Sequence, residues 1–146
     1  MKLTEIQEMW NKDSKINDLD LGKSSTQTAE LHAKYLNLLT NSKLQLRKFE
    51  ADNLRLRRNK FKYYRGEMTR EELEDNGWLQ YQGVKPLKNE MDEIINCDED
   101  VIKSIDKVEY IKAVHYQLEQ IIRSLNGRAW EIKNAIEWTK FTNGLM

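Results

Sequence analysis

Apolar side chains recur every three, four or seven residues over a long stretch that contains neither Pro nor Gly, from Thr26 to about Arg65. The apolar positions are Leu31, Tyr35, Leu38, Leu39, Leu46, Phe49, Leu56 and Tyr63. This spacing is that of one helix face and predicts a single helix of about 40 residues, about 60 Å long. Gly66 follows it and is expected to end the helix, because glycine readily adopts the left-handed conformation common at helix C-termini.

The same periodicity predicts a second long helix from about Asp98 to Leu125. Its apolar face consists of Val101, Ile105, Val108, Ile111, Leu118, Ile121, Ile122 and Leu125. Asn126 and Gly127 are expected to break or bend this helix, because both residues favour turns. A last helix is predicted from about residue 128 to 142. Its apolar side chains are Ala129, Ile132, Ala135 and Ile136, flanked by Trp138 and Phe141.

Shorter elements are indicated by helix-capping patterns. Thr4 and Gln7 have the spacing of a capping box and predict an N-terminal helix that ends near Lys12. The polar stretch from 13 to 25 is then expected to be a loop. Farther along, Thr69 and Glu72 have the same spacing and predict a short acidic helix to about residue 75, before a loop that is rich in turn-forming residues.

These elements predict an all-α fold in two regions. Residues 1–97 form an N-terminal helical region with a basic helix at 26–66 and an acidic linker at 67–97, and residues 98–146 form a C-terminal helical region. The chain of 146 residues is 39% hydrophobic and 33% charged, with one Pro. So polar a chain has limited apolar surface to bury alone, which favours coiled-coil-like helix packing and an oligomer that shares its cores between subunits.

The single Cys97 excludes an internal disulfide and suits a reducing cytosol; we expect it to be a buried or half-buried small residue on a helix. No apolar run approaches the roughly 18 residues of a membrane span, and the N-terminus lacks the apolar core of a signal peptide. The sequence therefore predicts a soluble, intracellular protein without a membrane partner.

Charge is distributed unevenly although the formal net charge is zero. From Lys43 to Arg65 there are nine Lys or Arg and two acids, a surplus of seven, and four of the cations share one helix face within about 80°. These four are Arg55, Arg58, Lys62 and Arg65. Such a stripe is unfavourable unless phosphates or a facing acidic surface offset it. Residues 67–109 hold thirteen acids and five bases, net −8, and could shield the stripe when DNA is absent.

Two tyrosines, Tyr63 and Tyr64, lie between the last two cations of the stripe, Lys62 and Arg65. Aromatic rings beside a cationic track are typical of single-strand binding, because unstacked bases lie on them. Tyr63 falls on the apolar line of the helix and is interpreted as a core residue, which leaves Tyr64 as the candidate for stacking.

No catalytic or metal-binding pattern is present. His32 and His115 have no Cys or carboxylate at metal-ligand spacing, and we interpret both as ordinary helix residues. The Gly22-Lys23-Ser24 run lacks the Gly that a phosphate-binding loop requires five residues before Gly22, where Asn17 stands. We therefore predict a protein that is not an enzyme and needs no metal or cofactor.

Two segments resemble one family. Residues 58–66 read basic, any, basic, hydrophobic, any, Tyr, Tyr, any, Gly, which resembles the DNA-binding signature of the UvsY family of recombination mediators of T-even-like bacteriophages. Residues 126–136 resemble that family's Gly-containing turn and final helix. The resemblance covers most of the chain but is weak over 67–91, and nothing is carried across that segment.

The resemblance implies a mediator that binds single-stranded DNA, helps to displace the phage single-strand-binding protein, and loads or stabilises a RecA-like recombinase filament in recombination, repair and replication. It implies a ring of six or seven subunits assembled through the C-terminal region, here Ala129, Ile132, Ala135, Ile136 and Trp138. It also implies the cytoplasm of the infected bacterial host as the place of action.

The family's two basic DNA contacts fall on Arg58 and Lys60. On an ideal helix these side chains point about 160° apart, so either DNA passes between neighbouring elements or one of them is structural. Lys62 and Arg65 add charge beyond the family pattern, and Arg55, Arg57 and Tyr64 remain further candidates.

The main alternative function is a coiled-coil scaffold protein whose stripe binds an acidic partner. A regulator of duplex DNA and an enzyme are disfavoured, because no helix-turn-helix or catalytic pattern occurs.

Overall fold

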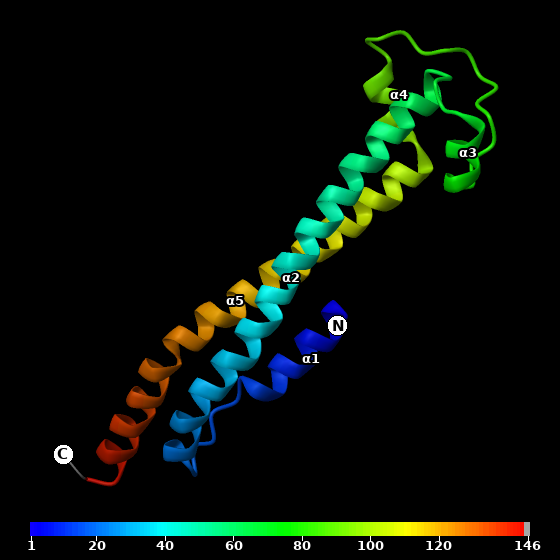
Figure 1. Cartoon of the computed structure of the whole chain (residues 1–146). Helices are drawn as coiled ribbons and strands as arrows, with labels where there is room; N and C mark the ends of the chain where they lie inside the picture. The colour runs from blue at the N-terminus through cyan, green and yellow to red at the C-terminus, as the bar shows by residue number, and fades with distance from the viewer. Residues whose placement is uncertain (145–146) are drawn as a thin grey trace. The chain divides into compact units, whose positions relative to one another are not determined.

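A computed structural model describes residues 1–144 (Figure 1). Over this range the chain forms helices and no strand, which confirms the predicted all-α fold. The helices are α1 (Leu3–Asp13), α2 (Leu21–Tyr64), α3 (Arg70–Asn76), α4 (Met91–Cys97) and α5 (Glu99–Thr142).

The chain divides into two compact units, and each long helix contributes to both. The first unit is Met1–Gln45 with Ile111–Met146, and the second is Leu46–Tyr110. This division does not follow the predicted boundary between residues 97 and 98. The reason is that each unit is built from a segment of α2 packed on a segment of α5, so residues distant in sequence share a core.

In the first unit, α1 and the early part of α2 pack with the later part of α5. Its buried apolar residues are Ile6, Tyr35, Ile111, Val114, Leu118, Ile121, Leu125 and Ile132. Asp13 joins the three helices: its carboxylate accepts hydrogen bonds from Lys34 (2.7 Å) and Tyr35 (2.8 Å), and its carbonyl accepts one from Arg128 (3.0 Å). The Tyr35 ring also packs edge-on against Trp10.

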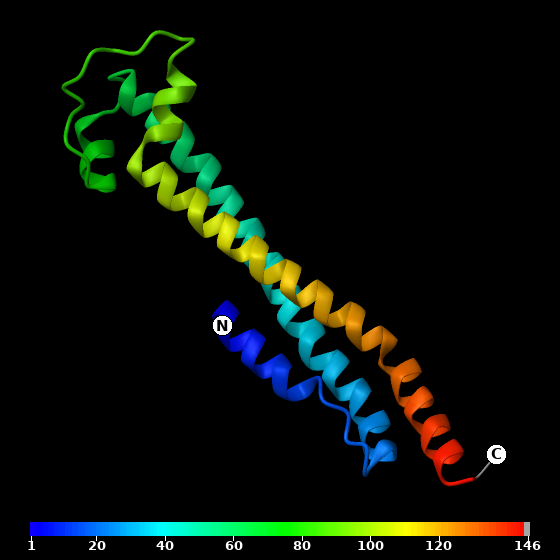
Figure 2. The same ribbon diagram turned by 180° about the vertical axis from the view of Figure 1, so that it is seen from behind.

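In the second unit, residues 46–64 of α2 and the first turns of α5 lie side by side (Figure 1, Figure 2). Asn53 on α2 donates a hydrogen bond to Ser104 on α5 at 3.0 Å. A small core forms at the end of this pair where α4 packs. Its buried members are Met91, Ile95 and Val101, with Leu56, Tyr64 and Ile105 against them.

Two predicted helix starts were placed too late. In α1, Glu5 accepts a hydrogen bond from the Lys2 backbone N–H, so Thr4 lies inside the helix and is not its cap. The second helix begins at Leu21 instead of Thr26, because the Asp20 carboxylate accepts the Lys23 backbone N–H at 3.0 Å and caps it. The predicted loop is therefore confined to 14–20.

The sequence predicted a break or a bend at Asn126 and Gly127; the helix does not break there, because α5 continues through both residues. A glycine costs a helix interior about 1 kcal/mol relative to alanine, an amount that tertiary packing of the neighbouring turns can offset. Leu125, Arg128 and Ile132 are buried on the same helix face. The tendency of Asn126 and Gly127 to end a helix is thus outweighed by the burial of neighbouring side chains.

Other local predictions are confirmed. Gly66 has φ +71° and ends α2, with the Glu67 N–H bonded to the Lys62 carbonyl and the Gly66 N–H to the Tyr63 carbonyl. Thr69 caps α3 by accepting the Glu72 N–H at 3.1 Å. The linker contains one helix that was not predicted, α4, and Cys97 at its end is exposed, so the expectation of a buried cysteine is wrong.

Candidate nucleic-acid interface

Lys60 is buried beneath aromatic rings and carboxylates. Its side chain is on the face of α2 that packs in the second unit, and only 4% of the residue is exposed. The ammonium lies 2.8 Å from the Asp100 carboxylate and 3.2 Å from that of Asp98. It also lies 4.0 Å from the Trp78 ring centroid and 5.3 Å from that of Tyr63, within cation–π range. Lys60 is therefore not a surface cation, in keeping with the alternative in which one residue of the Arg58/Lys60 pair is structural.

Asp98 organises this buried cluster as the N-cap of α5. One carboxylate oxygen accepts the N–H groups of Asp100 (2.9 Å) and Val101 (3.2 Å), and the other accepts from Tyr64 (2.6 Å) and Lys60. Burial raises the pKa of the Asp98 carboxyl, but these hydrogen bonds and the Lys60 charge outweigh it and leave the pKa below its usual value. The carboxylate is the form that holds α2 and α5 together here.

Both tyrosines of the signature have structural contacts. Burial and the hydrogen bond to Asp98 raise the pKa of Tyr64 above its usual range, and the ring packs on the small core of the unit. Tyr64 is therefore not the free stacking ring that we predicted. The Tyr63 hydroxyl donates to the Leu79 carbonyl at 2.7 Å, and its ring contacts Trp78 and Tyr81.

Two of the predicted DNA contacts near the end of α2 are paired with acids from the segment that follows. Lys62 lies 2.9 Å from Glu72 on α3, and Arg65 lies 3.1 Å from Glu67. All four side chains are partly exposed, so water screens these pairs and each contributes little to stability. Shielding of the stripe by acids is seen at these positions, whereas its release by DNA remains a prediction.

The remaining predicted cations have little or no internal pairing. Arg58 is exposed and Arg57 half-buried, and neither forms an ion pair within the described residues. Arg55 is exposed and makes a long contact of 3.4 Å with Asp52, one turn away. These three arginines are available to anions in a way that Lys60 is not.

Three arginines that were not grouped by the charge pattern lie on one side of α2 and of the turn that directly follows it. Arg47, Arg58 and Arg65 fall within about 20° of one another on an ideal helix, because steps of eleven and seven residues return to nearly the same angle. We call these three residues the arginine row. Phe61 lies about 40–60° from them on the ideal helix, and its ring centroid is 5.3 Å from the Arg65 guanidinium. The eleven-residue spacing was the signal that could have identified Arg47.

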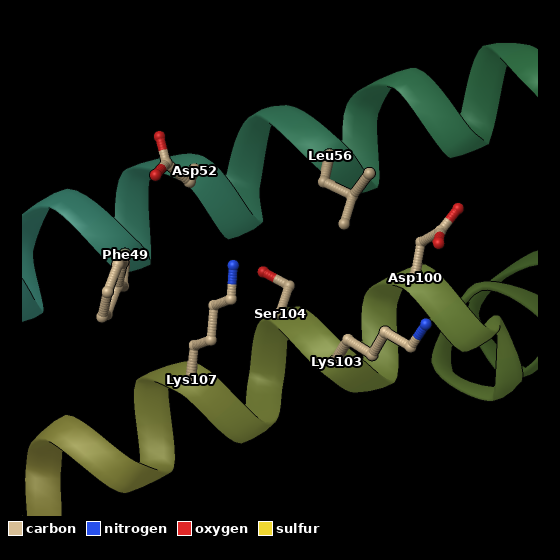
Figure 3. A pocket seen from close by; sticks show the side chains of 7 residues that line it. All are labelled: Phe49, Asp52, Leu56, Asp100, Lys103, Ser104 and Lys107. Carbon is tan, nitrogen blue, oxygen red and sulfur yellow. The ribbon is translucent and has the colours of Figure 1, made fainter. Parts of the chain in front are cut away.

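On another side of the same helix pair a groove of about 390 Å³ has mixed charge. The lining residues are Phe49, Asp52 and Leu56 of α2 and Asp100, Lys103, Ser104 and Lys107 of α5. Figure 3 shows Phe49 and Leu56 pointing toward α5, and Ser104 and Lys107 pointing toward α2. Two lysines and two aspartates line it. Their charges cancel, so this groove offers a polyanion little attraction.

The C-terminal residues predicted to oligomerise divide into two sets. Ile132 is 3% exposed and packs within its own unit, whereas Ala135 is half-buried. Ala129, Ile136 and Trp138 are exposed, the last by 65%. Trp138 stacks on Phe141, and both rings face solvent in the single chain. Self-association through this region remains a prediction.

The described residues give no sign of a catalytic or metal-binding role. His115 contacts the Ser42 hydroxyl at 3.1 Å and Glu119 at 2.8 Å, as an ordinary helix residue would. No group of three or more potential metal ligands occurs among residues 1–144. Each helix in this range is too short or too polar to span a membrane.

Comparison with known proteins gives one family. The model of the family described as "Recombination, repair and ssDNA binding protein UvsY" matches residues 9–145. A crystal structure of the bacteriophage T4 recombination mediator protein UvsY superposes with a TM-score of 0.83 at 22% identity, covering 98% of each chain. A second structure of that protein gives a TM-score of 0.81 at 20% identity, covering 97% of this chain and 99% of the other.

At these identities the solved structures show that the fold is shared. The comparison with curated protein sequences gives no match. The family match spans nearly the whole chain and includes both segments whose residue patterns indicated it. The chain therefore belongs to the UvsY family of recombination, repair and single-stranded-DNA-binding proteins.

Proposed function

We propose that this protein binds single-stranded DNA through the cationic surface of α2, helps to displace single-strand-binding protein, and loads or stabilises a RecA-like recombinase filament. The main support for the proposal is that several arginines on α2 form no internal ion pair within the described part of the chain. The most important of them is Arg58, which belongs to the arginine row. Phosphate contacts of this kind are independent of sequence, and no element of the described chain is arranged to read base edges in a groove.

Lys60 has a positioning role in this proposal. It is held between Asp98, Asp100 and the Trp78 ring, so it fixes the end of α2 without reaching a phosphate. Arg58, Arg57 and Arg55 are then the DNA contacts of the signature region, and Lys62 and Arg65 join them if phosphates replace Glu72 and Glu67.

Self-association would multiply weak contacts. A subunit with a few phosphate contacts binds weakly and loses affinity steeply with salt, while linked copies of the site raise avidity by roughly 10²–10⁴. A ring of six or seven subunits, as the family resemblance implies, would present the arginine row repeatedly. Acting on phage DNA, the protein would work in the cytoplasm of the infected host.

Fluorescence anisotropy with labelled oligonucleotides tests the proposal. We expect tighter binding to single strands than to duplex, and an affinity that falls with a log–log salt slope of about −0.7 for each phosphate neutralised. Arg57→Ala with Arg58→Ala should weaken binding and flatten that slope. Arg70→Ala is the control, because it removes a cation from exposed α3. Salt-independent binding, or equal losses in the variant and the control, would contradict the proposal.

The alternative is a scaffold protein whose arginines bind an acidic protein partner. It is favoured by Glu67 and Glu72, which show that carboxylates already pair with Arg65 and Lys62. Competition separates the two functions: unlabelled poly-glutamate that displaces the oligonucleotide at equal charge concentration would favour the scaffold.

A further inference from the structure

A second groove lies beside the end of α2, on the side of the arginine row. Its volume is about 350 Å³, within the range of about 300–1,000 Å³ typical of ligand pockets. It is formed where the loop before α4 passes the last turns of α2. The lining residues are Phe61, Arg65, Lys85, Pro86, Lys88 and Met91.

Charge distinguishes this groove from the one in Figure 3. Three cations and no carboxylate line it, whereas two lysines and two aspartates line the other. Lys85 and Lys88 are exposed and form no ion pair within the described residues. Arg65 pairs with Glu67, but both side chains are nearly half exposed, so a phosphate can replace that carboxylate at small cost.

Phe61 supplies an aromatic surface inside this cationic setting. The residue is 39% exposed, which is high for a large apolar side chain next to a core. The Arg65 guanidinium lies 5.3 Å from the ring centroid and leaves part of the ring open. Met91, 3% exposed, belongs to the small core, so one wall of the groove is firmly held. An aromatic ring with cations around it is the arrangement on which bases of single strands stack.

The groove also continues the surface already assigned to DNA. Phe61 follows Arg58 by three residues and precedes Arg65 by four, so the three side chains share one side of α2. A strand contacting Arg58 would reach the groove within the next nucleotides.

We propose that this groove holds one nucleotide of the bound single strand, with the base on Phe61 and the flanking phosphates on Lys85 and Lys88. The proposal rests on the proposed single-stranded-DNA function and identifies where a base, as distinct from the backbone, is recognised. The two lysines come from the linker, whose acids were predicted to shield the stripe when DNA is absent, so the same segment carries both signs of charge.

The phosphate contacts are tested with Lys85→Ala and Lys88→Ala combined. Binding of an oligo-dT should weaken, and the salt slope should become less negative by about 1.4, because two phosphate contacts are lost. Lys103→Ala with Lys107→Ala is the matched control, since it removes two lysines from the mixed-charge groove of the same unit, and we expect an unchanged slope. Equal slopes for the wild type and the Lys85/Lys88 variant would overturn the proposal.

The base contact is tested with Phe61→Leu, which keeps an apolar side chain on the core side. Affinity for oligo-dT should fall about 5-fold or more, while affinity for an abasic oligonucleotide of the same length should stay unchanged. Circular dichroism must show unchanged helicity; Phe61→Tyr, which restores an aromatic face, should recover oligo-dT binding. Equal losses on both oligonucleotides, or no recovery by Tyr, would overturn stacking on Phe61.

Different results would reject the proposed DNA-binding function and the proposed nucleotide site in the groove. A wild-type protein that binds no single strand would reject the proposed function and this site with it. A wild type that binds, with affinity lost in Arg57/Arg58 variants but kept in Lys85/Lys88 and Phe61 variants, would keep the function and reject the groove.

Discussion

At the scale of residues, Arg58 and Lys60 show that two cations only two positions apart on a helix can have opposite environments. Arg58 faces solvent, whereas Lys60 is enclosed by two aspartates and an indole ring. A buried charge is tolerated only when paired, and removing one partner leaves the other uncompensated. Loss of Arg58 is therefore expected to reduce DNA binding by removing a phosphate contact, and loss of Lys60 by destabilising the end of α2.

Lys60→Met is expected to destabilise the protein by about 3 kcal/mol, because it leaves Asp98 buried with one charged partner removed. Arg58→Ala, on the exposed side of the same helix, should change stability by less than about 0.5 kcal/mol. Urea denaturation followed by circular dichroism measures both. The double variant with Lys60→Met and Asp98→Asn should lose less free energy of unfolding than the two single variants lose in sum. Strict additivity would show that the two residues are not coupled.

Stability should depend on pH through Asp98. Its pKa is lower in the folded protein than the usual value of about 3.9, so its contribution is complete above that value and is lost as the pH falls through the lower folded pKa. Asp98→Asn should thus be less stable than the wild type at pH 7, with a smaller gap at pH 3. Asp106→Asn, on exposed helix surface, is the control. A gap that stays constant from pH 7 to pH 3 would contradict this assignment.

At the scale of elements, two glycines illustrate opposite uses of the same residue. Gly66 has φ +71° and ends α2, while Gly127 lies inside α5 with no positive φ. A Cβ added at Gly127 would meet no atom within 4 Å. The helix thus accepts a flexible residue that its packing does not require.

Gly127→Ala is expected to stabilise the protein by about 0.5–1 kcal/mol, because alanine loses less conformational entropy in a helix. Gly66→Ala should destabilise it by about 1–2 kcal/mol through the left-handed conformation. Thermal unfolding compares the two variants. A lower melting temperature for Gly127→Ala would mean that α5 bends there in solution, as the sequence alone had indicated.

At the scale of the whole molecule, apolar surface remains exposed on the C-terminal part of α5. Trp130, Ile136, Trp138 and Phe141 are all exposed in the single chain. Large exposed aromatic side chains in a group are typical of interaction surfaces. This is the surface that self-association would cover, whereas Ile132 already has its contacts within the unit.

Self-association should respond differently to two substitutions. Ile136→Asp with Trp138→Asp is expected to give smaller oligomers that keep their helicity and bind DNA far more weakly, since avidity is lost. Ile132→Asp should instead reduce stability, because it buries a charge. Light scattering and circular dichroism distinguish these results. A full-sized assembly from the Ile136/Trp138 variant would place the interface elsewhere.

Local residue patterns were enough to predict the all-α class, the end of α2 at Gly66, the cap of α3 at Thr69 and the family. The first three depend on neighbours in sequence, through periodicity, capping and backbone conformation, whereas the family followed from the resemblance of residues 58–66 and 126–136 to its motifs. The same patterns also identified the exposed cations Arg55 and Arg58, because a helix face follows from spacing alone.

Tertiary structure decided which cations are exposed to a ligand and whether a helix continues past a glycine. Lys60 became structural only because Trp78, Asp98 and Asp100 approach it from distant positions, and no spacing within α2 encodes that approach. The continuity of α5 through Gly127 came from burial of Leu125 and Ile132, which outweighs a local cost of about 1 kcal/mol. Lys85 and Lys88 line one groove with Phe61 only because the linker folds back on α2, an arrangement set by packing across more than twenty residues of intervening chain.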